Sequence, residues 1–269
     1  MAPWTSAKEI IKLSKVKSEE YFYNFVLGLP YTGSGNVVTE ETITKNIKDE
    51  KISTDGSRVI IGIDTGIISY YVVGNAKGIF EYGSCEGYDD IEKLLKKYPR
   101  SVAIFDQGGD LTAPRKLRDK YRGRIFLCHY SVDRKTYQLV RWGKDDEAGN
   151  VIVDRNRMIQ LIIDELTAGD KIILEGDQEY WYDYILHWKN IYRVKEENML
   201  GVMESKWERS GDDHWVHATV YYRTGVDRFK SNRGVIFGKE ERPFGIPLAP
   251  NIIIGKDDLP LNWQKQFKK

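Results

Sequence analysis

The stretch RVIIGIDTGI, residues 58–67, predicts a buried β-strand that ends on an acid. Apolar residues run from Val59 to Ile63 with one glycine among them, and Asp64 and a Thr-Gly turn follow directly. Runs of this kind are typical of strands in the centre of a sheet. A buried carboxylate without a partner costs several kcal/mol, so we expect Asp64 to have a partner, a metal ion or access to water.

The same arrangement occurs again in SVAIFDQGGD, residues 101–110. Side chains alternate between the two faces of a strand, which places Val102, Ile104 and Asp106 on one face. A single aspartate after a strand is most often an ordinary turn or cap residue. Two apolar strands that both end on aspartate instead indicate a functional site, because binding and catalytic groups in open α/β sheets lie at strand ends.

The order of the expected elements predicts an α/β fold. We expect strands over 58–64, 101–106 and 124–130, hairpins over 67–85 and 137–154, helices over 88–98, 114–121, 155–169 and 180–192, and a last strong element over 212–225. Three antiparallel strands followed by alternating helices and strands predict a mixed β-sheet flanked by helices. The predicted domain spans residues 56–228, after an N-terminal extension or linker over 1–55 and before a C-terminal tail over 229–269.

Length and composition restrict the class of protein. The 269 residues are 41% apolar and suffice for one large domain with a substantial core. The net charge of +1 identifies no partner, and two cysteines cannot form a disulfide framework or a zinc cluster. No apolar run approaches the ~20 residues of a membrane span, and the N-terminus lacks a signal-peptide core. We therefore expect a soluble intracellular protein with no membrane partner.

A third cluster of polar residues lies in DDHWVHATVYY, residues 212–222. On a helix, Asp213, Val216 and His217 share one face, so an acid and an imidazole lie on a stripe that should pack inward. Asp212 is expected to cap the helix, where an acceptor satisfies free N–H groups and a negative charge suits the helix dipole. His214 and His217 are three residues apart and could also converge. For either histidine, a structural role fits the pattern as well as a ligand role does.

The three clusters together predict a divalent metal site. Carboxylate oxygens without cysteine ligands suit Mg²⁺ or Mn²⁺, and a divalent cation removes the repulsion between carboxylates that share a site. Two such ions about 4 Å apart could activate a water and stabilise the leaving oxygen of a phosphodiester. The candidate ligands are Asp64, Asp106, Asp213, His214 and His217.

A basic block suggests the substrate. Between Leu111 and Lys144 ten basic residues stand against two acidic ones, a local charge of +8. A solvated helix face explains part of this block equally well. Its place directly after the Asp106 loop favours a role in holding phosphates, which Lys and Arg patches do without reading bases. The candidate DNA-binding residues are Arg115, Lys116, Arg118, Arg134 and Lys135.

The motifs IGIDTG, AIFDQGGDLTAPRKL and DDHWVHATVYY, in this order, resemble the nuclease domain of the large terminase subunit of tailed bacteriophages, which has a ribonuclease H-like (RuvC-type) fold. EYFYNFVLGLPYT, residues 20–32, is similar to the segment that follows the ATPase domain in that family. The resemblance implies a nuclease that cuts concatemeric double-stranded viral DNA with Mg²⁺ or Mn²⁺. Asp64 and Asp106 match the first two catalytic acids of the family, and we expect Asp213 to be the third, with His214 or His217 as alternatives.

The resemblance also implies partners and a location. These are double-stranded DNA, an ATPase domain, the small terminase subunit and the portal protein, in the host cytoplasm. The sequence contains no Walker GxxxxGK[ST] loop, so we expect no P-loop ATP hydrolysis by this chain. Two alternatives remain open: a junction resolvase or transposase of the same fold, and a catalytically inactive nucleic-acid-binding scaffold.

Overall fold

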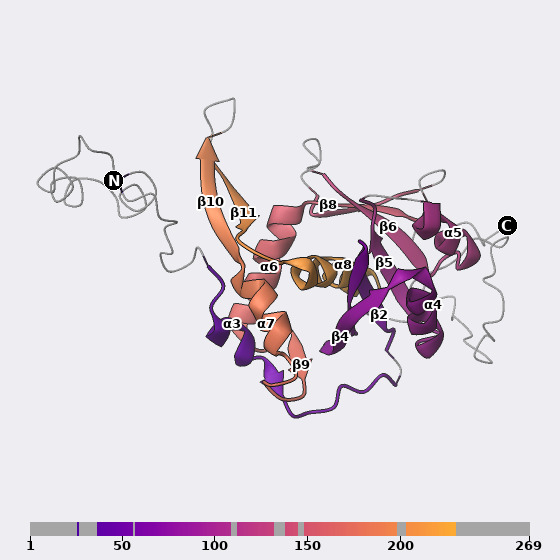
Figure 1. Cartoon of the computed structure of the whole chain (residues 1–269), viewed down its shortest axis with the longest axis horizontal. Coiled ribbons are helices and arrows are strands. Elements are labelled where there is room, and N and C mark those ends of the chain that lie inside the picture. The colour runs from indigo at the N-terminus through magenta and orange to yellow at the C-terminus, as the bar shows by residue number, and fades with distance from the viewer. Residues whose placement is uncertain are drawn as a thin grey trace, which may run out of the picture. The chain divides into compact units, whose positions relative to one another are not determined.

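The computed structural model of the chain describes residues 26, 37–55, 57–108, 112–131, 138–144, 148–197 and 203–229 (Figure 1). The candidate DNA-binding residues Arg134 and Lys135, most of the predicted N-terminal extension and nearly all of the predicted tail lie outside these residues. None of the helices in the described part is long and apolar enough to cross a membrane.

One mixed sheet organises the described residues. Its nine strands run in the order β1-β9-β4-β3-β2-β5-β6-β8-β7. They are β1 (Ile47–Lys48), β2 (Ile60–Asp64), β3 (Ile68–Gly74), β4 (Gly78–Glu86), β5 (Val102–Asp106), β6 (Ile125–Tyr130), β7 (Val140–Trp142), β8 (Asn150–Val153) and β9 (Ile173–Glu175). Strands β2, β3 and β4 are antiparallel neighbours, whereas β5 is parallel to β2 and β6 is parallel to β5. The predicted α/β fold, a mixed β-sheet flanked by helices, is confirmed.

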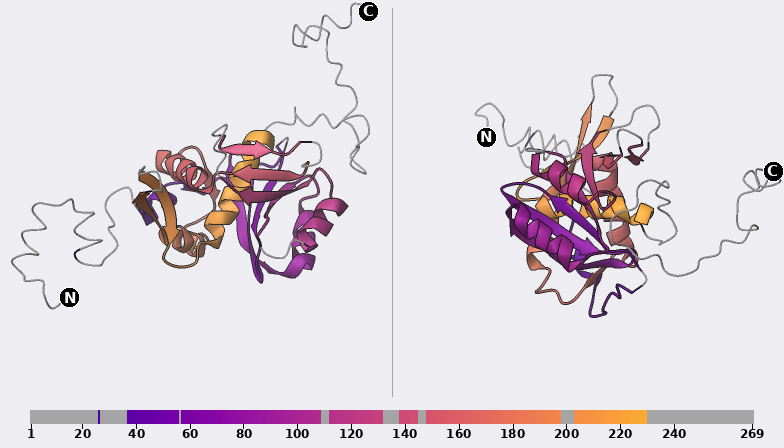
Figure 2. Two further views of the ribbon diagram at one scale, coloured as in Figure 1. Left: turned by 90° about the horizontal axis from the view of Figure 1, so that it is seen from above. Right: turned by 90° about the vertical axis from the view of Figure 1, so that its right-hand side faces the viewer.

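Helices cover both faces of the sheet (Figure 2). They are α3 (Glu40–Thr44), α4 (Gly87–Lys97), α5 (Thr112–Lys120), α6 (Arg155–Ala168), α7 (Tyr182–Lys189) and α8 (His214–Phe229). Leu94 of α4 and Leu117 of α5 are buried in one apolar cluster with Ile63 and Phe105 of the sheet. Residues of α6, α7 and α8 are buried in a second cluster with Ile60 and Ile104. The strand alternation thus separates two cores, one on each face.

One part of the fold differs from the sequence prediction. The helix expected over 180–192 ends at Lys189, and β10 (Ile191–Glu197) pairs with β11 (Met203–Arg209) as a separate two-stranded sheet. Charged and polar residues interrupt both strands, so they lack the apolar run that reveals a buried strand. The segment before residue 56 also joins the fold, because β1 pairs in parallel with β9. The predicted division at residues 55 and 56 stays a prediction.

Local chemistry explains where the helix before β9 begins and ends. The carboxylate of Asp154 accepts a hydrogen bond from the backbone N–H of Arg157, which caps the first turn of α6. Gly169 ends the helix in the left-handed region at φ 83°. Glycine adopts this conformation without the strain that a side chain would cause. The predicted stop at Gly169 is confirmed.

Helix α8 lies directly against the centre of the sheet at Gly62. A Cβ atom at this position would come within 2.0 Å of the Ala218 carbonyl oxygen and 2.3 Å of the Tyr222 amide nitrogen. Gly225 of α8 makes the reciprocal contact, since its Cβ would lie 2.7 Å from the side chain of Ile104. The helix backbone therefore approaches β2 and β5 as closely as two missing side chains allow.

We expect Gly62→Ala to lower the free energy of unfolding by about 1–3 kcal/mol or more, because the new methyl group meets backbone atoms that cannot rotate away. Urea unfolding measures this change. The exposed strand residue Ser84 provides the control, and Ser84→Ala should stay within about 0.5 kcal/mol of the parent. A Gly62→Ala variant as stable as the parent would contradict the close contact.

Candidate metal centre

Asp64 and Asp106 stand side by side at the carboxyl ends of two parallel strands. The last residue pair between β2 and β5 is Ile63 with Phe105, and the two aspartates come next on each strand. Ile63 and Phe105 point into the core beneath α4 and α5, so the aspartates face the opposite side, where α8 lies. Both side chains are partly buried. The register of the sheet thus brings together the two acids that the sequence singled out.

Helix α8 supplies a polar partner to each carboxylate. His214 Nδ1 lies 2.8 Å from Asp64 Oδ2, and the Tyr221 hydroxyl donates a hydrogen bond of 3.0 Å to Asp106 Oδ1. His214 and Tyr221 are seven residues apart, which places them two turns apart on one helix face. The His214 ring also stacks on Tyr70 of β3, with 4.4 Å between ring centroids and an interplanar angle of 8°. The carboxylates are therefore oriented and not merely adjacent.

The two acids impose an electrostatic cost on the folded state. Burial raises the pKa of Asp106, and the negative charge of Asp64 adds to this effect. Hydrogen bonds from Tyr221 and the Gly108 backbone offset part of the increase. The hydrogen bond to Asp64 raises the pKa of His214. A divalent cation between the carboxylates would relieve their repulsion, so the two acids fit a hard cation chemically.

Asp213 has other partners. It is 1% exposed, and its carboxylate lies 3.1 Å from His217 Nε2, 3.4 Å from Arg209 Nη1 and 3.9 Å from Arg155 Nη2. Burial alone would raise the pKa of Asp213, but His217 and Arg209 outweigh it and hold the pKa below its usual value. The charge of Asp213 is thus already balanced by the protein. The predicted role of Asp213 as a third ligand beside Asp64 and Asp106 stays a prediction.

His217 belongs to the Asp213 group of side chains. Its Nδ1 lies 2.9 Å from the Tyr130 hydroxyl, and the Tyr130 ring stacks on Tyr221 at 5.4 Å between centroids. His217 therefore links buried Asp213 to the tyrosine that holds Asp106. Within the described ranges, no group of three or more His, Cys, Asp or Glu side chains is arranged to hold a metal ion. Of the five predicted ligands, Asp64 and Asp106 are neighbours in the sheet, His214 contacts Asp64, and His217 contacts Asp213.

The start of α8 corrects the predicted role of Asp212. The helix begins at His214, so the residue before its first turn is Asp213 and not Asp212. Asn190 explains the delay: its side chain donates to the Asp212 carbonyl, and its own carbonyl accepts from the Ser210 backbone. These bonds hold residues 210–212 outside the helix. Asp212 is exposed and is not the cap.

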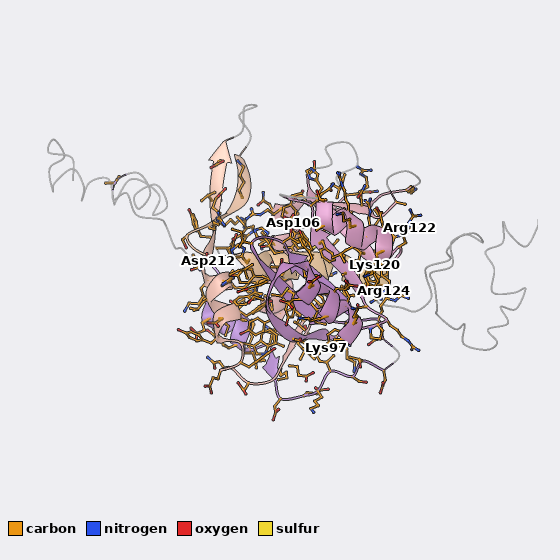
Figure 3. The ribbon with its side chains drawn as sticks, turned by 45° about the vertical axis from the view of Figure 1, so that its right-hand side comes forward. Lys97, Asp106, Lys120, Arg122, Arg124 and Asp212 are labelled. Atoms are coloured by element: carbon orange, nitrogen blue, oxygen red, sulfur yellow. The ribbon has the colours of Figure 1, made fainter. Side chains whose placement is uncertain are left out.

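The basic block separates into structural and exposed residues. Arg124 donates to the carbonyl oxygens of Leu95, Tyr98 and Ser101, so it ties α4 to the start of β5. Lys120 pairs with Glu92, and Figure 3 shows Lys120, Arg122 and Arg124 grouped near the end of α5. Arg118 donates to Asn150 at 3.3 Å. Arg115 and Lys116 are exposed on α5 and remain candidates for phosphate contacts.

Sequence reasoning missed the tyrosines of this site. Tyr221 could have been predicted from the sequence, because it lies on the same helix face as His214 and Ala218. Tyr70 and Tyr130 could not, since only the sheet order brings β3 and β6 to α8. Aromatic residues in strands usually indicate packing. Here they also fix the imidazole rings.

The chain is similar to solved structures of phage large terminases and of their nuclease domains. The large terminase nuclease of thermophilic phage G20c with bound magnesium has 13% identity and a TM-score of 0.47, covering 72% of this chain and 99% of that chain. The nuclease domain of the large terminase subunit gp2 of bacterial virus Sf6 has 11% identity and a TM-score of 0.48, covering 69% and 96%. The large terminase of another thermophilic bacteriophage has 11% identity and a TM-score of 0.42, covering 81% and 52%. No protein-family model and no curated protein matches the chain.

We expect Asp106→Asn to raise the thermal stability near neutral pH in the absence of divalent cations. Burial raises the pKa of Asp106, so the fold binds its proton more tightly than the unfolded chain does. The parent should therefore gain stability as the pH falls through the raised pKa, and the advantage of the variant should shrink toward about pH 4. Calorimetry at several pH values measures this difference.

Two comparisons sharpen the Asp106 measurement. Asp170→Asn removes the same charge from an exposed side chain and should show no such pH dependence. Added Mg²⁺ should stabilise the parent and leave the Asp106→Asn variant nearly unchanged. A variant that melts no higher than the parent near neutral pH in EDTA would contradict the strained carboxylate pair.

Asp213→Asn should lower the free energy of unfolding by about 1–3 kcal/mol, because it removes the charge that faces two arginines and His217. Asp212→Asn, at an exposed neighbour, should change it by less than about 0.5 kcal/mol. Urea unfolding of both variants in EDTA makes the comparison. If Asp213 serves only as a metal ligand, its Asn variant will be as stable as the parent or more stable.

Proposed function

We propose that this chain is a metal-dependent DNA endonuclease that acts in bacteriophage DNA packaging. The observation that carries the proposal is the pair of carboxylates, Asp64 and Asp106, placed in register at the ends of parallel strands and oriented from α8. The burial of Asp106 beside a second negative charge supports a cation at this place. The packaging context and the double-stranded DNA substrate rest on the motif resemblance.

The residues of the chain fit a Mg²⁺ or Mn²⁺ site built on Asp64 and Asp106. Bound there, such ions would supply Lewis-acid stabilisation of a phosphodiester and a more acidic water, which suits hydrolysis. Tyr221 holds one oxygen of Asp106 and His214 holds one oxygen of Asp64, so each side chain keeps a fixed direction toward the sheet edge. His214 is the better candidate for a third group, because the charge of Asp213 is already engaged by Arg155 and Arg209.

The finer parts of the proposal concern the substrate and the partners. Arg115 and Lys116 project from α5 without a partner among the described residues, which supports a role in phosphate contact. The motif resemblance to large terminases supports cleavage of concatemeric viral DNA by two metal ions. It also supports three partners, namely an ATPase domain, the small terminase subunit and the portal protein, and a location in the host cytoplasm.

Nicking of supercoiled plasmid tests the proposal. We expect cleavage with Mg²⁺ or Mn²⁺, none in EDTA, and a loss of several orders of magnitude in Asp64→Asn and Asp106→Asn, because the removed charges hold the cation. The control Asp170→Asn carries the same charge change near the amino end of β9 and should cleave like the parent.

The outcome separates an enzyme from a scaffold. A folded Asp64→Asn variant that cleaves at the parental rate would overturn the metal-site proposal. If the parent protein binds duplex DNA but does not cleave it with any divalent cation, the chain is instead an inactive nucleic-acid-binding scaffold.

A further inference from the structure

An arginine cluster lies where the parallel strands β2, β5 and β6 begin, at the edge of the sheet opposite to the carboxylate pair. Its members are Arg58, Arg100, Arg122 and Arg124. The register of the three strands brings Arg58, Arg100 and Arg122, one before each strand, to nearly the same level. With strands about 4.8 Å apart, the backbones of these three arginines span roughly 10 Å.

Two turns carry the exposed members of the cluster, Arg100 and Arg122. Each turn is closed by a backbone hydrogen bond just before its strand begins, at Ser101 and at Arg124. The Arg124 side chain fastens the two turns together, because its guanidinium donates to the carbonyl oxygens of Ser101 and Tyr98, each at 3.0 Å. Arg100 and Arg122 therefore project from two turns that are held side by side.

The arginines repel one another in the folded protein. Burial lowers the pKa of Arg124, and the positive charge of Arg58 adds to this effect. Burial also lowers the pKa of Arg58. In the described part of the chain, Arg58, Arg100 and Arg122 form no ion pair with a carboxylate. A negatively charged ligand would relieve this repulsion, as a cation would relieve that of the two aspartates at the other edge.

Two acids reach the turns, and a lysine engages each of them. Glu92 pairs with Lys120, and Glu81 pairs with Lys97 at 2.7 Å. Figure 3 shows basic side chains on this side of the molecule, namely Lys97, Lys120, Arg122 and Arg124. The lysines thus balance these two acids, and the charge of the arginines is available to an outside partner.

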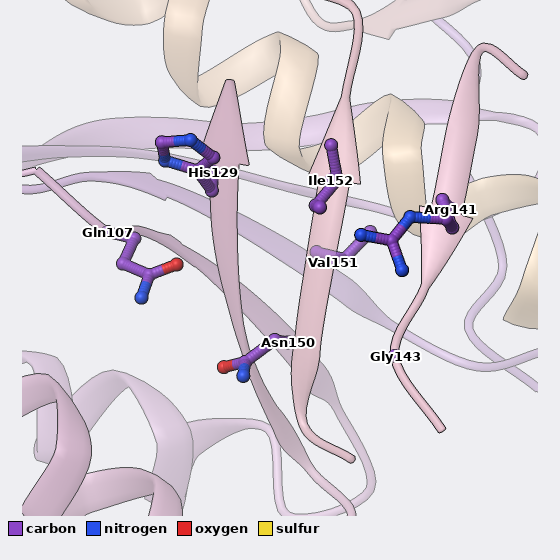
Figure 4. Close-up of a pocket in the computed structure, with 7 residues that line it drawn as sticks. All are labelled: Gln107, His129, Arg141, Gly143, Asn150, Val151 and Ile152. Atoms are coloured by element: carbon purple, nitrogen blue, oxygen red, sulfur yellow. The ribbon is translucent and has the colours of Figure 1, made fainter. Parts of the chain in front are cut away.

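The cluster ends at β6. The next strand, β8, begins at Asn150, which accepts a hydrogen bond of 3.3 Å from Arg118. Asn150 also lines a hollow of about 280 Å³ together with Gln107, His129 and Arg141 (Figure 4). Arg118 therefore joins α5 to β8 and does not extend the cluster.

The chemistry of the cluster favours phosphates over a protein surface. A guanidinium binds phosphate oxygens through two parallel N–H groups, which a lysine cannot do. Protein interfaces are instead centred on apolar and aromatic side chains. The large apolar side chains that are exposed in the described part, such as Ile67 and Tyr182, lie outside these turns. Several arginines without an apolar centre are typical of contact with a nucleic-acid backbone.

We infer that the arginine cluster binds the phosphate backbone of duplex DNA, as a contact surface separate from the carboxylate pair. The inference rests on the proposed nuclease function and adds a distant contact to it. Arg58 and Asp64 are six residues apart along the chain of β2, which corresponds to about 20 Å. A duplex that reaches both places therefore has about six base pairs between the bound phosphate and the cleaved bond. The cluster holds DNA and takes no part in the chemistry.

The salt dependence of duplex binding tests the cluster. Fluorescence anisotropy of a labelled duplex is measured at several salt concentrations, in EDTA to prevent cleavage. Arg100→Gln combined with Arg122→Gln should lower the slope of log K against log salt by about 2, because two phosphate contacts are lost. The control with the same charge change combines Lys51→Gln with Lys189→Gln. These exposed lysines lie beside β9 and on α7, and the control should keep the parental slope.

A second variant keeps the charge and removes the planar guanidinium. Arg100→Lys combined with Arg122→Lys should keep the parental slope and weaken binding by about fivefold, because lysine cannot bind a phosphate through two N–H groups in parallel. Urea unfolding midpoints show whether each variant folds. At saturating enzyme, the double Gln variant should nick plasmid at the parental rate, whereas at limiting enzyme it should nick more slowly.

The possible results separate the cluster from the function on which it rests. Equal slopes for the double Gln variant and the lysine control would overturn the cluster and leave the nuclease proposal intact, and so would a parent that nicks plasmid without binding the duplex in EDTA. If the double Gln variant loses binding to labelled polyglutamate and keeps duplex binding, the cluster instead receives an acidic protein. A parent whose duplex binding depends on the cluster but which never nicks plasmid would support the cluster and refute the proposed function.

Discussion

The close contact between α8 and Gly62 is the constraint on which the rest of the structure depends. Because β2 carries no side chain there, the helix backbone reaches the sheet itself, and a Cβ atom would collide with the Ala218 carbonyl oxygen at 2.0 Å. His214 lies one turn before Ala218 and Tyr221 lies one turn after it. The close approach of α8 to the sheet brings His214 to 2.8 Å from Asp64 and Tyr221 to 3.0 Å from Asp106. A helix displaced outward by a methyl group would leave both carboxylates without their partners.

The same contact explains why the site can tolerate two partly buried acids. The sheet register makes Asp64 and Asp106 neighbours, and burial raises the pKa of Asp106, so the pair opposes folding at neutral pH. Hydrogen bonds from α8 offset part of this cost, and a divalent cation would offset more. Asp213 shows the contrasting solution, in which two arginines and a histidine neutralise the charge within the protein. Acids with internal partners stabilise a fold, whereas acids without them are available to a ligand.

Much of the fold and half of the site can be predicted from the sequence, for physical reasons that particular residues make clear. The apolar runs before Asp64 and Asp106 determine two buried strands, and parallel pairing then makes the acids adjacent. Strands β10 and β11 could not be predicted, because charged residues interrupt their apolar pattern. The partners of Asp213 could not be predicted either, since Arg155 and Arg209 approach it only in the folded chain. Helical periodicity places Asp213 and His217 on one face correctly, but it cannot tell whether that face meets a metal or an arginine.

The location of a bound cation tests the central claim most directly. Crystals of the protein soaked in MnCl₂ and measured at the manganese absorption edge would show anomalous scattering wherever Mn²⁺ binds. The account predicts a peak between the carboxylates of Asp64 and Asp106, on the side of the sheet that α8 covers, and no peak beside Asp213. A peak beside Asp213, or none near Asp64 and Asp106 at full soaking concentration, would contradict it.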